Sequence, residues 1–174
     1  SHYKGYPKKY IREVYNNLSI VMGTRHSNQF INTCALCGLC GEVCPTDVDM
    51  GEICHNARGQ MVEQKRMPPS AHDFALRDMA FSNGEKFALA HNAPGLDASS
   101  YVFFPGCQLG GDSPEYVEKS YTFLRETFHN NVGLMLRCCG APADWAGRKD
   151  LFANSQSEFR AEYEKLGRPK VILA

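Results

Sequence analysis

The chain has 174 residues, which is enough for one medium-sized domain or two small ones. Its 19 basic residues balance 19 acidic residues, so bulk charge does not favour a protein that binds nucleic acid or a membrane surface. No apolar run approaches the ~20 residues that span a bilayer, and the opening "SHYKGYPKKY" lacks the apolar core of a secretion signal.

Eight cysteines are the most informative feature of the composition. They are Cys34, Cys37, Cys40, Cys44, Cys54, Cys107, Cys138 and Cys139. An even number can indicate a disulfide framework, but that pattern is typical of small secreted chains. The crowded cysteines at 34–44 and the adjacent pair at 138–139 have poor geometry for disulfides. We therefore expect thiolates that bind metal in a reducing compartment, and we predict a cytoplasmic protein.

The first cysteine run is "CALCGLCGEVCP", residues 34–45. Its spacing, C-x2-C-x2-C-x3-C-P, is that of a ferredoxin ligand run, in which closely spaced thiolates wrap an iron–sulfur cube. Gly38 and Gly41 allow the backbone to approach the cube closely and to adopt unusual φ angles. Zinc is the alternative, but structural zinc sites usually have two separated cysteine pairs. We predict that the four cysteines of this run, Cys34, Cys37, Cys40 and Cys44, bind one or more [4Fe-4S] clusters as the cofactor.

The fourth cysteine of such a run ligates the other cluster in two-cluster ferredoxins. By that rule Cys34, Cys37 and Cys40 share one cubane. Cys44 then ligates a second cluster, whose other three thiolates lie outside residues 1–174.

Cys54 lies in a helix that we predict after Asp49. The apolar stripe of this helix consists of Met50, Ile53, Ala57 and Met61. Cys54 could supply the missing ligand, but we favour a small buried residue beside the stripe, because free cysteine is among the most buried residue types.

The middle of the chain, residues 66–99, is predicted to be a connector with a short helix closed by Gly84 and then a loop. Strands are predicted at 101–104, 134–136 and 171–173. Between them we predict a helix that starts at Pro114, capped by Asp112 or Ser113, and a helix over 149–165. The β-α-β-α-β order predicts a parallel sheet with right-handed crossovers.

The remaining cysteines follow two of these strands. Cys107 comes after the first strand, and Cys138 and Cys139 come after the second. Because sites in parallel sheets form beyond the carboxyl ends of the strands, we expect the three thiols to converge on a metal or cluster. Arg137 could hold an anionic substrate or cluster thiolate, or could form a surface salt bridge, and both interpretations stand. Trp145 is expected to be buried in packing rather than to line a pocket.

Two stretches, "FFPGCQ" and "RCCGAP", resemble the cysteine-rich CCG domain of heterodisulfide reductase subunits and of related glycolate, lactate and succinate oxidoreductase subunits. The run at 34–45, followed by "GEIC" and "AR", resembles the second ligand run of the dicluster ferredoxin-like region in the same families. Those families also have a first ligand run and a later C-x-x-C, neither of which occurs in this sequence. We therefore expect the chain to be a piece of a longer protein.

The resemblance implies a mixed fold: an α-helical ferredoxin-like region at 1–65, the connector at 66–99, and the first half of an α/β parallel-sheet, Rossmann-like CCG domain at 100–174. It also implies an electron-transfer subunit or domain of a heterodisulfide-reductase-like oxidoreductase. Electrons would pass from a [4Fe-4S] cluster to a second cluster or metal at Cys107, Cys138 and Cys139.

The expected partners are other subunits or domains of a redox complex, a flavoprotein among them. The chain itself lacks the Gly-x-Gly-x-x-Gly dinucleotide fingerprint. Two alternatives remain open. One is a non-catalytic relay that docks a flavoprotein, and the other is a structural module that binds zinc.

Overall fold

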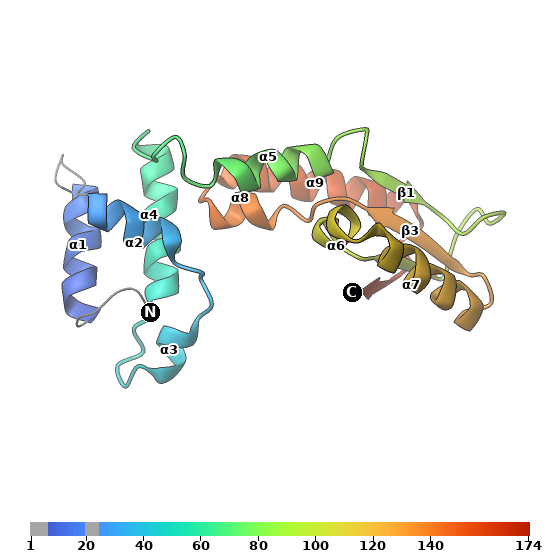
Figure 1. The fold of residues 1–174 in the computed structure, drawn as a ribbon, viewed down its shortest axis with the longest axis horizontal. Coiled ribbons are helices and arrows are strands. Elements are labelled where there is room, and N and C mark those ends of the chain that lie inside the picture. The colour runs from blue at the N-terminus through green and yellow to red at the C-terminus, as the bar shows by residue number, and fades with distance from the viewer. Residues whose placement is uncertain (1–6, 20–24) are drawn as a thin grey trace. The chain divides into compact units, whose positions relative to one another are not determined.

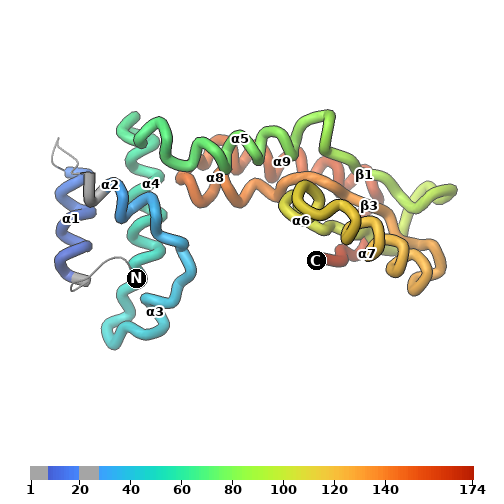
Figure 2. Tube along the Cα trace, viewed as in Figure 1, coloured from blue at the N-terminus to red at the C-terminus, as the bar shows by residue number. Residues whose placement is uncertain are grey.

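The structure is a computed structural model that describes residues 7–19 and 25–174 (Figure 1). The chain divides into two compact units, and Figure 2 follows it through both. The first unit consists of Ser1–Phe74 and Pro142–Lys149, and the second of Ala75–Ala141 and Asp150–Ala174. In the part of the chain that the structure describes, no helix is both long and apolar enough to cross a membrane.

The first unit is built from helices. They are α1 (Pro7–Ser19), α2 (Arg25–Thr33), α3 (Leu39–Val43), α4 (Met50–Glu63) and most of α8 (Ala141–Trp145). Asp49 caps α4, because its Oδ1 accepts hydrogen bonds from the backbone N–H groups of Gly51 (2.6 Å) and Glu52 (3.4 Å). The predicted helix after Asp49 is thus confirmed.

The core of the first unit lies between α1, α2 and α4. It consists of buried Val14, Ile31, Ala57 and Met61, with Leu18, Phe30, Ile53 and Met67 packed against it. The apolar stripe predicted for α4 therefore faces the other helices, and burial of these side chains stabilises the unit. Met50, the first member of the stripe, is also buried.

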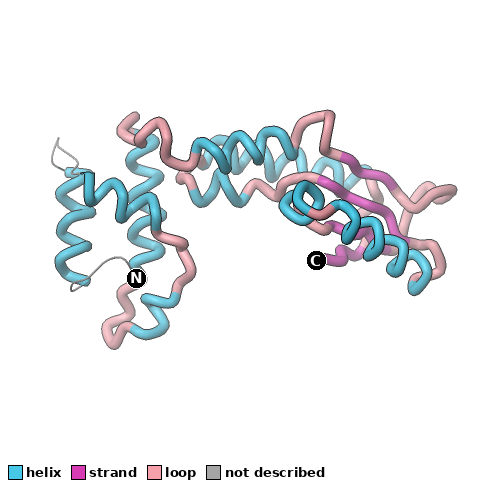
Figure 3. Tube along the Cα trace, in the orientation of Figure 1, coloured by secondary structure: helices cyan, strands magenta, loops and turns pink. Residues whose placement is uncertain are grey.

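The second unit contains a four-stranded sheet covered by helices (Figure 3). Its elements are α5 (Asp73–Ser82), β1 (Leu89–His91), β2 (Tyr101–Phe104), α6 (Cys107–Asp112), α7 (Pro114–Thr127), β3 (Val132–Leu136), α9 (Lys149–Lys165) and β4 (Lys170–Leu173). The strand order is β1-β3-β2-β4. β2 pairs in parallel with both β3 and β4, as the sequence predicts, whereas β1 pairs antiparallel with β3.

The antiparallel edge strand β1 differs from the prediction, which placed residues 66–99 in a connector with a helix and a loop. β1 has only three residues, "LAH", and they show no β-rich pattern. Its neighbour explains the pairing: a Cβ on Gly133 of β3 would lie 2.5 Å from the carbonyl oxygen of His91. The glycine therefore permits a close approach that the strand's own sequence does not reveal.

The two faces of the sheet are covered by different helices, with α7 in front and α9 behind in Figure 1. Phe103 of β2 and Leu134 of β3 pack with Val117 of α7. The residues adjacent to them in the two strands, Val102 and Met135, pack on the opposite face. There they meet Phe159 and Leu166. This alternation is the period of two expected for strands buried on both faces.

The helix bounds agree closely with the sequence, but one predicted cap is wrong. α9 covers the predicted residues 149–165, and α7 starts at Pro114. Ser113 occupies the position before α7 but makes no side-chain cap. Its hydroxyl instead donates to a carboxylate oxygen of Asp112 at 3.0 Å, so neither side chain satisfies the first turn of the helix.

Candidate functional site

The loop that carries the first cysteines turns through two left-handed residues. Leu36 has φ 54° and Gly38 has φ 73°. The positive φ of Gly38 agrees with the unusual backbone that the sequence predicts, while a leucine at positive φ is uncommon and indicates a constrained loop. Cys40 lies in the first turn of α3, and Cys44 ends that helix. Cys37 and Cys40 are exposed, so two thiols of the loop are accessible.

Two glycines allow the loop to lie against the start of α4. A Cβ on Gly41 would lie 3.2 Å from the Cβ of Asp49, the residue that caps α4. A Cβ on Gly51 would lie 3.4 Å from the Cα of Leu36. Gly41 therefore serves close packing against the capping aspartate, whereas its predicted role, close approach to the cluster, stays a prediction.

Arg58 of α4 is a buried cation beside this loop, with 2% of its surface exposed. It donates hydrogen bonds from Nε to the carbonyl of Ile31 (2.9 Å), from Nη1 to that of Trp145 (2.7 Å) and from Nη2 to that of Cys34. Among the described residues no carboxylate pairs with the guanidinium. Burial lowers the pKa of Arg58, while the neighbouring Cys34 and Cys54 thiols act in the opposite direction. Within the described residues, the acidic groups that act on the charge of Arg58 are the thiols of Cys34 and Cys54.

Cys54 lies close to Arg58 and Cys34. It is fully buried, as the sequence predicts. Burial, followed by the nearby thiols of Cys34 and Cys40, raises the pKa of Cys54 to about 12. The contact with Cys34 agrees with the less favoured of the two interpretations of Cys54, because it depends on the packing of the loop against α4 rather than on the local pattern.

Cys44 makes different contacts. Its Sγ lies 3.3 Å from the Oγ1 of Thr46. That hydrogen bond, together with the backbone N–H groups of Thr46 and Val48, lowers the pKa of the Cys44 thiol. Cys44 is therefore engaged by the chain that follows α3, which agrees with its predicted assignment to another cluster without testing it.

The thiols of the first unit are the donor type that binds an iron–sulfur cluster. Within residues 7–19 and 25–174, no group of three or more His, Cys, Asp or Glu side chains is arranged to hold one ion. A cubane distributes its thiolates over four irons, so its ligands lie farther apart than those of one tetrahedral ion. The thiols are suitable ligands for such an anionic cluster, and the buried guanidinium of Arg58 supplies a positive charge beside them.

The second group of cysteines lies at the carboxyl edge of the sheet. β2 and β3 are parallel, with Phe103 opposite Leu134, so the turns that follow them leave the same edge. Cys107 starts α6 after β2, and Cys138 and Cys139 follow β3. The Cys138 thiol interacts with the thiols of both Cys139 and Cys107. The structure thus brings the three predicted residues together, while metal binding there stays a prediction.

The turn after β3 is held by two hydrogen bonds and a glycine. The N–H of Cys138 donates to Asn83 Oδ1 (3.1 Å), and the carbonyl of Cys139 accepts from Gln156 Nε2 (2.8 Å). Gly140 has φ 90°, and a Cβ on it would lie 2.8 Å from Ser155 Oγ of α9. A glycine is therefore required after the cysteine pair both by the backbone and by the helix beside it.

The two adjacent cysteines have opposite acidities. The hydrogen bond with Cys139, followed by burial, raises the pKa of Cys138. The same hydrogen bond, helped by the backbone N–H groups of Ala141 and Cys139, lowers the pKa of the exposed Cys139 to about 6. In the absence of a bound metal, Cys139 is thus the more reactive thiol at neutral pH.

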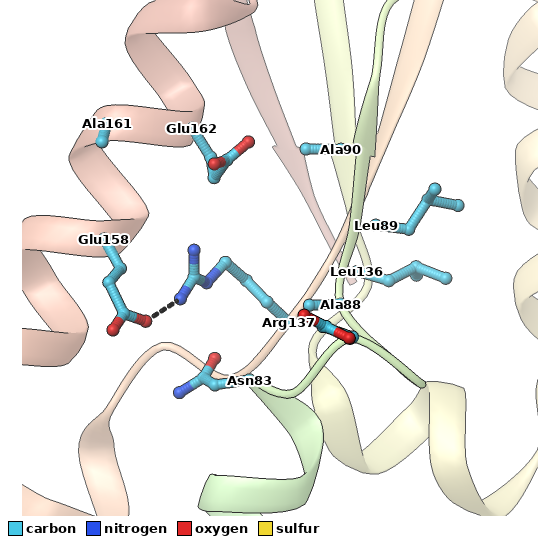
Figure 4. A pocket seen from close by; sticks show the side chains of 10 residues that line it. Asn83, Ala88, Leu89, Ala90, Leu136, Arg137, Glu158, Ala161 and Glu162 are labelled. Atoms are coloured by element: carbon cyan, nitrogen blue, oxygen red, sulfur yellow. Dashed lines mark hydrogen bonds and ion pairs between the residues drawn. The ribbon is translucent and has the colours of Figure 1, made fainter.

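Arg137, which precedes the pair, lines a pocket of about 400 Å³. Figure 4 shows its guanidinium directed toward Glu158 of α9, where Nη2 lies 2.8 Å from Oε2. This ion pair agrees with the salt-bridge alternative, but the arginine is 5% exposed and is not a surface residue. Its Nε has no hydrogen-bond partner among the described residues. Trp145, expected to be buried, is 54% exposed, which corrects that prediction.

Residues 1–49 match the model of a family described as a 4Fe-4S dicluster domain. The match includes the run from Cys34 to Cys44, and the cofactor of the chain is therefore of the 4Fe-4S type, as predicted. No curated protein and no solved structure matches the chain. The 4Fe-4S dicluster domain indicates an electron-transfer role.

Proposed function

We propose that this chain is an iron–sulfur electron-transfer subunit or domain of a heterodisulfide-reductase-like oxidoreductase. A bound [4Fe-4S] cluster takes up and releases single electrons at a potential set by its surroundings. In this proposal Cys34, Cys37 and Cys40 hold one cluster, and electrons pass from it to the site at Cys107, Cys138 and Cys139. The iron–sulfur region is taken as residues 1–65, and the cysteine-rich region as 100–174, with 66–99 between them.

The observation that carries the first part of the proposal is the environment of Arg58. A buried guanidinium that bonds only to backbone carbonyls has an uncompensated charge, which is costly. A cluster with thiolate ligands is anionic and would neutralise it at the loop where Arg58 already contacts Cys34. A neutral or cationic occupant of the loop would leave the charge unbalanced.

The second part of the proposal is supported by the gathering of three thiols beyond β2 and β3. Cys139 is exposed and acidic, so it can ligate metal or react with a disulfide as a thiolate. The pocket beside Arg137 gives a small molecule room near this turn. These features favour a redox site over a purely structural one.

The alternative is a relay that carries electrons without doing chemistry of its own and docks a flavoprotein. The two hypotheses differ in what the second group of cysteines does. Disulfide chemistry requires Cys139 or its bound metal, whereas a relay requires only the first cluster. For either hypothesis we propose cytoplasmic partners that are subunits or domains of the same redox complex.

The proposed function is tested by substitution in the anaerobically prepared chain. We expect Cys37→Ser to abolish or strongly disturb the electron paramagnetic resonance (EPR) signal of the reduced cluster. Cys139→Ser is expected to abolish disulfide reduction by the complex while leaving that signal in place. Full retention of iron and of the broad visible absorbance in Cys37→Ser would contradict the cluster assignment. Unchanged disulfide reduction in Cys139→Ser would favour the relay.

A further inference from the structure

One face of α4 is directed at the loop that carries the first cysteines. Gly51, Cys54 and Arg58 are spaced by three and four residues, which places them on one face of the helix. Gly51 packs against the backbone of Leu36, and Arg58 donates to the carbonyl of Cys34. Cys54 lies between these two contacts, so its side chain is presented to the loop.

The burial of Cys54 is therefore different from that of an ordinary core residue. The apolar stripe of α4, which includes Ala57 and Met61, packs on the core of the first unit. Cys54 is not among the side chains of that cluster, although it is a buried side chain of the core and no part of it is exposed. The ionisable groups that act on its thiol are Cys34, Cys40 and Arg58. Two thiols and a cation are the surroundings of a ligand rather than those of a packing residue.

Cys44 is a poorer candidate than Cys54 for a ligand beside Cys34 and Cys40. Its thiol contacts Thr46 at 3.3 Å, and its other interactions are with the backbone of Val48 and the charge of Asp47. All three residues follow α3, on the chain leading to α4. Of the two other cysteines in the first unit, Cys44 and Cys54, it is Cys54 that the fold brings to the 34–40 loop.

We propose that Cys54 supplies the fourth thiolate to the cubane that Cys34, Cys37 and Cys40 bind, with Arg58 as its buried counter-charge. The proposal rests on the proposed function, since it requires a cluster at this loop. When the Fe–S bond to Cys54 forms, the thiol proton is released to solvent, because the thiolate is the ligand. One cluster would then be complete within this chain, and Cys44 would remain free to ligate another.

The test compares Cys54→Ala and Cys54→Ser with Cys44→Ala as a matched control in the anaerobically prepared chain. Iron and acid-labile sulfide are measured per chain, and EPR spectra are recorded for the oxidised and the reduced forms. The cluster under test is identified by the signal that Cys37→Ser removes. We expect Cys54→Ala to lose at least one of the four irons, about a quarter of the cluster's iron, and to show a three-iron signal when oxidised. Cys44→Ala is expected to leave the signal unchanged.

The outcomes separate this proposal from the proposed function. An unsubstituted chain without iron and sulfide contradicts the proposed function itself. If the unsubstituted chain holds a cubane, and Cys54→Ala fully retains its iron and its signal, only the role of Cys54 is contradicted. If Cys54→Ala does not fold, as judged by circular dichroism, Cys54→Ser decides because it preserves the side-chain size. A shifted signal or lost iron in Cys54→Ser then supports ligation, and an unchanged spectrum overturns it.

Discussion

Arg58 is the residue whose substitution separates charge from hydrogen bonding at the first site. It connects three backbone carbonyls, two of them in the segment from Ile31 to Cys34 and the third at Trp145. A lysine at this position keeps the charge but cannot reproduce the planar fork of the guanidinium. A methionine removes both the charge and the donors.

We expect Arg58→Met to lower the free energy of unfolding by about 2–4 kcal/mol, because buried carbonyls lose their donors. The reduction potential of the cluster should become more negative, since a nearby positive charge favours the reduced state. Arg58→Lys should also destabilise the chain but should shift the potential less. Urea unfolding and a redox titration followed by EPR measure the two effects. Equal potentials in the methionine and lysine variants would show that the charge of Arg58 does not act on the cluster.

The cysteine pair gives a pH-dependent prediction for the iron-free chain. Because the folded-state pKa of Cys139 is lowered to about 6, its thiolate predominates above that pH and is lost as the pH falls through it. Alkylation of Cys139 by iodoacetamide should therefore be nearly constant between about pH 7 and 8 and should fall below about pH 6. Cys138, whose pKa is raised, should remain unmodified. Mass spectrometry locates the label. A rate that still rises steeply near pH 8.5, the usual pKa of a thiol, would contradict the hydrogen-bonded pair.

At the scale of elements, the turn from β3 into α8 depends on Gly140. Its φ of 90° and the proximity of Ser155 leave no room for a side chain. We expect Gly140→Ala to lower the free energy of unfolding by about 2–4 kcal/mol, through backbone strain and overpacking against α9. Gly111→Ala is the matched control, because a Cβ there meets no atom within 4 Å. Urea unfolding of both variants makes the comparison. Similar losses in the two variants would mean that the turn is not constrained as described.

The elements that could be predicted from the sequence are those with a strong local pattern. α9 has a long apolar periodicity that ends before Gly167, and its bounds agree with the prediction. The short helices α3, α6 and α8 were not predicted, because five or six residues carry too little periodicity. β1 was missed because its pairing depends on Gly133 in another strand rather than on its own residues.

The candidate site shows the same division between local and long-range information. The spacing of Cys34, Cys37 and Cys40 is a local pattern and predicts a cluster directly. The meeting of Cys107 with the pair follows from parallel pairing of two predicted strands. The sequence raises Cys54 as a possible ligand but does not favour it, and it does not indicate Arg58, because their contacts arise where α4 packs against the loop and where the backbone of Trp145 accepts from Arg58.

At the scale of the whole molecule, the two groups of cysteines lie in different compact units. We therefore expect them to respond independently to substitution. Cys37→Ser should remove the EPR signal of the first cluster, while the far-UV circular dichroism and the alkylation pattern of the Cys138–Cys139 turn in the iron-free chain stay unchanged. Loss of that alkylation pattern in Cys37→Ser, with the pattern intact in the unsubstituted iron-free chain, would indicate that the second unit does not respond independently of the first.

We predict that the loop at 34–40 binds a redox-active [4Fe-4S] cluster. The most direct measurement is the content of iron and acid-labile sulfide in the anaerobically purified chain, combined with an EPR spectrum after reduction by dithionite. We expect iron and sulfide in equal amounts, about four of each for every cluster, and a signal of the reduced cluster that disappears in Cys37→Ser. Bound zinc without sulfide, and no signal on reduction, would contradict it.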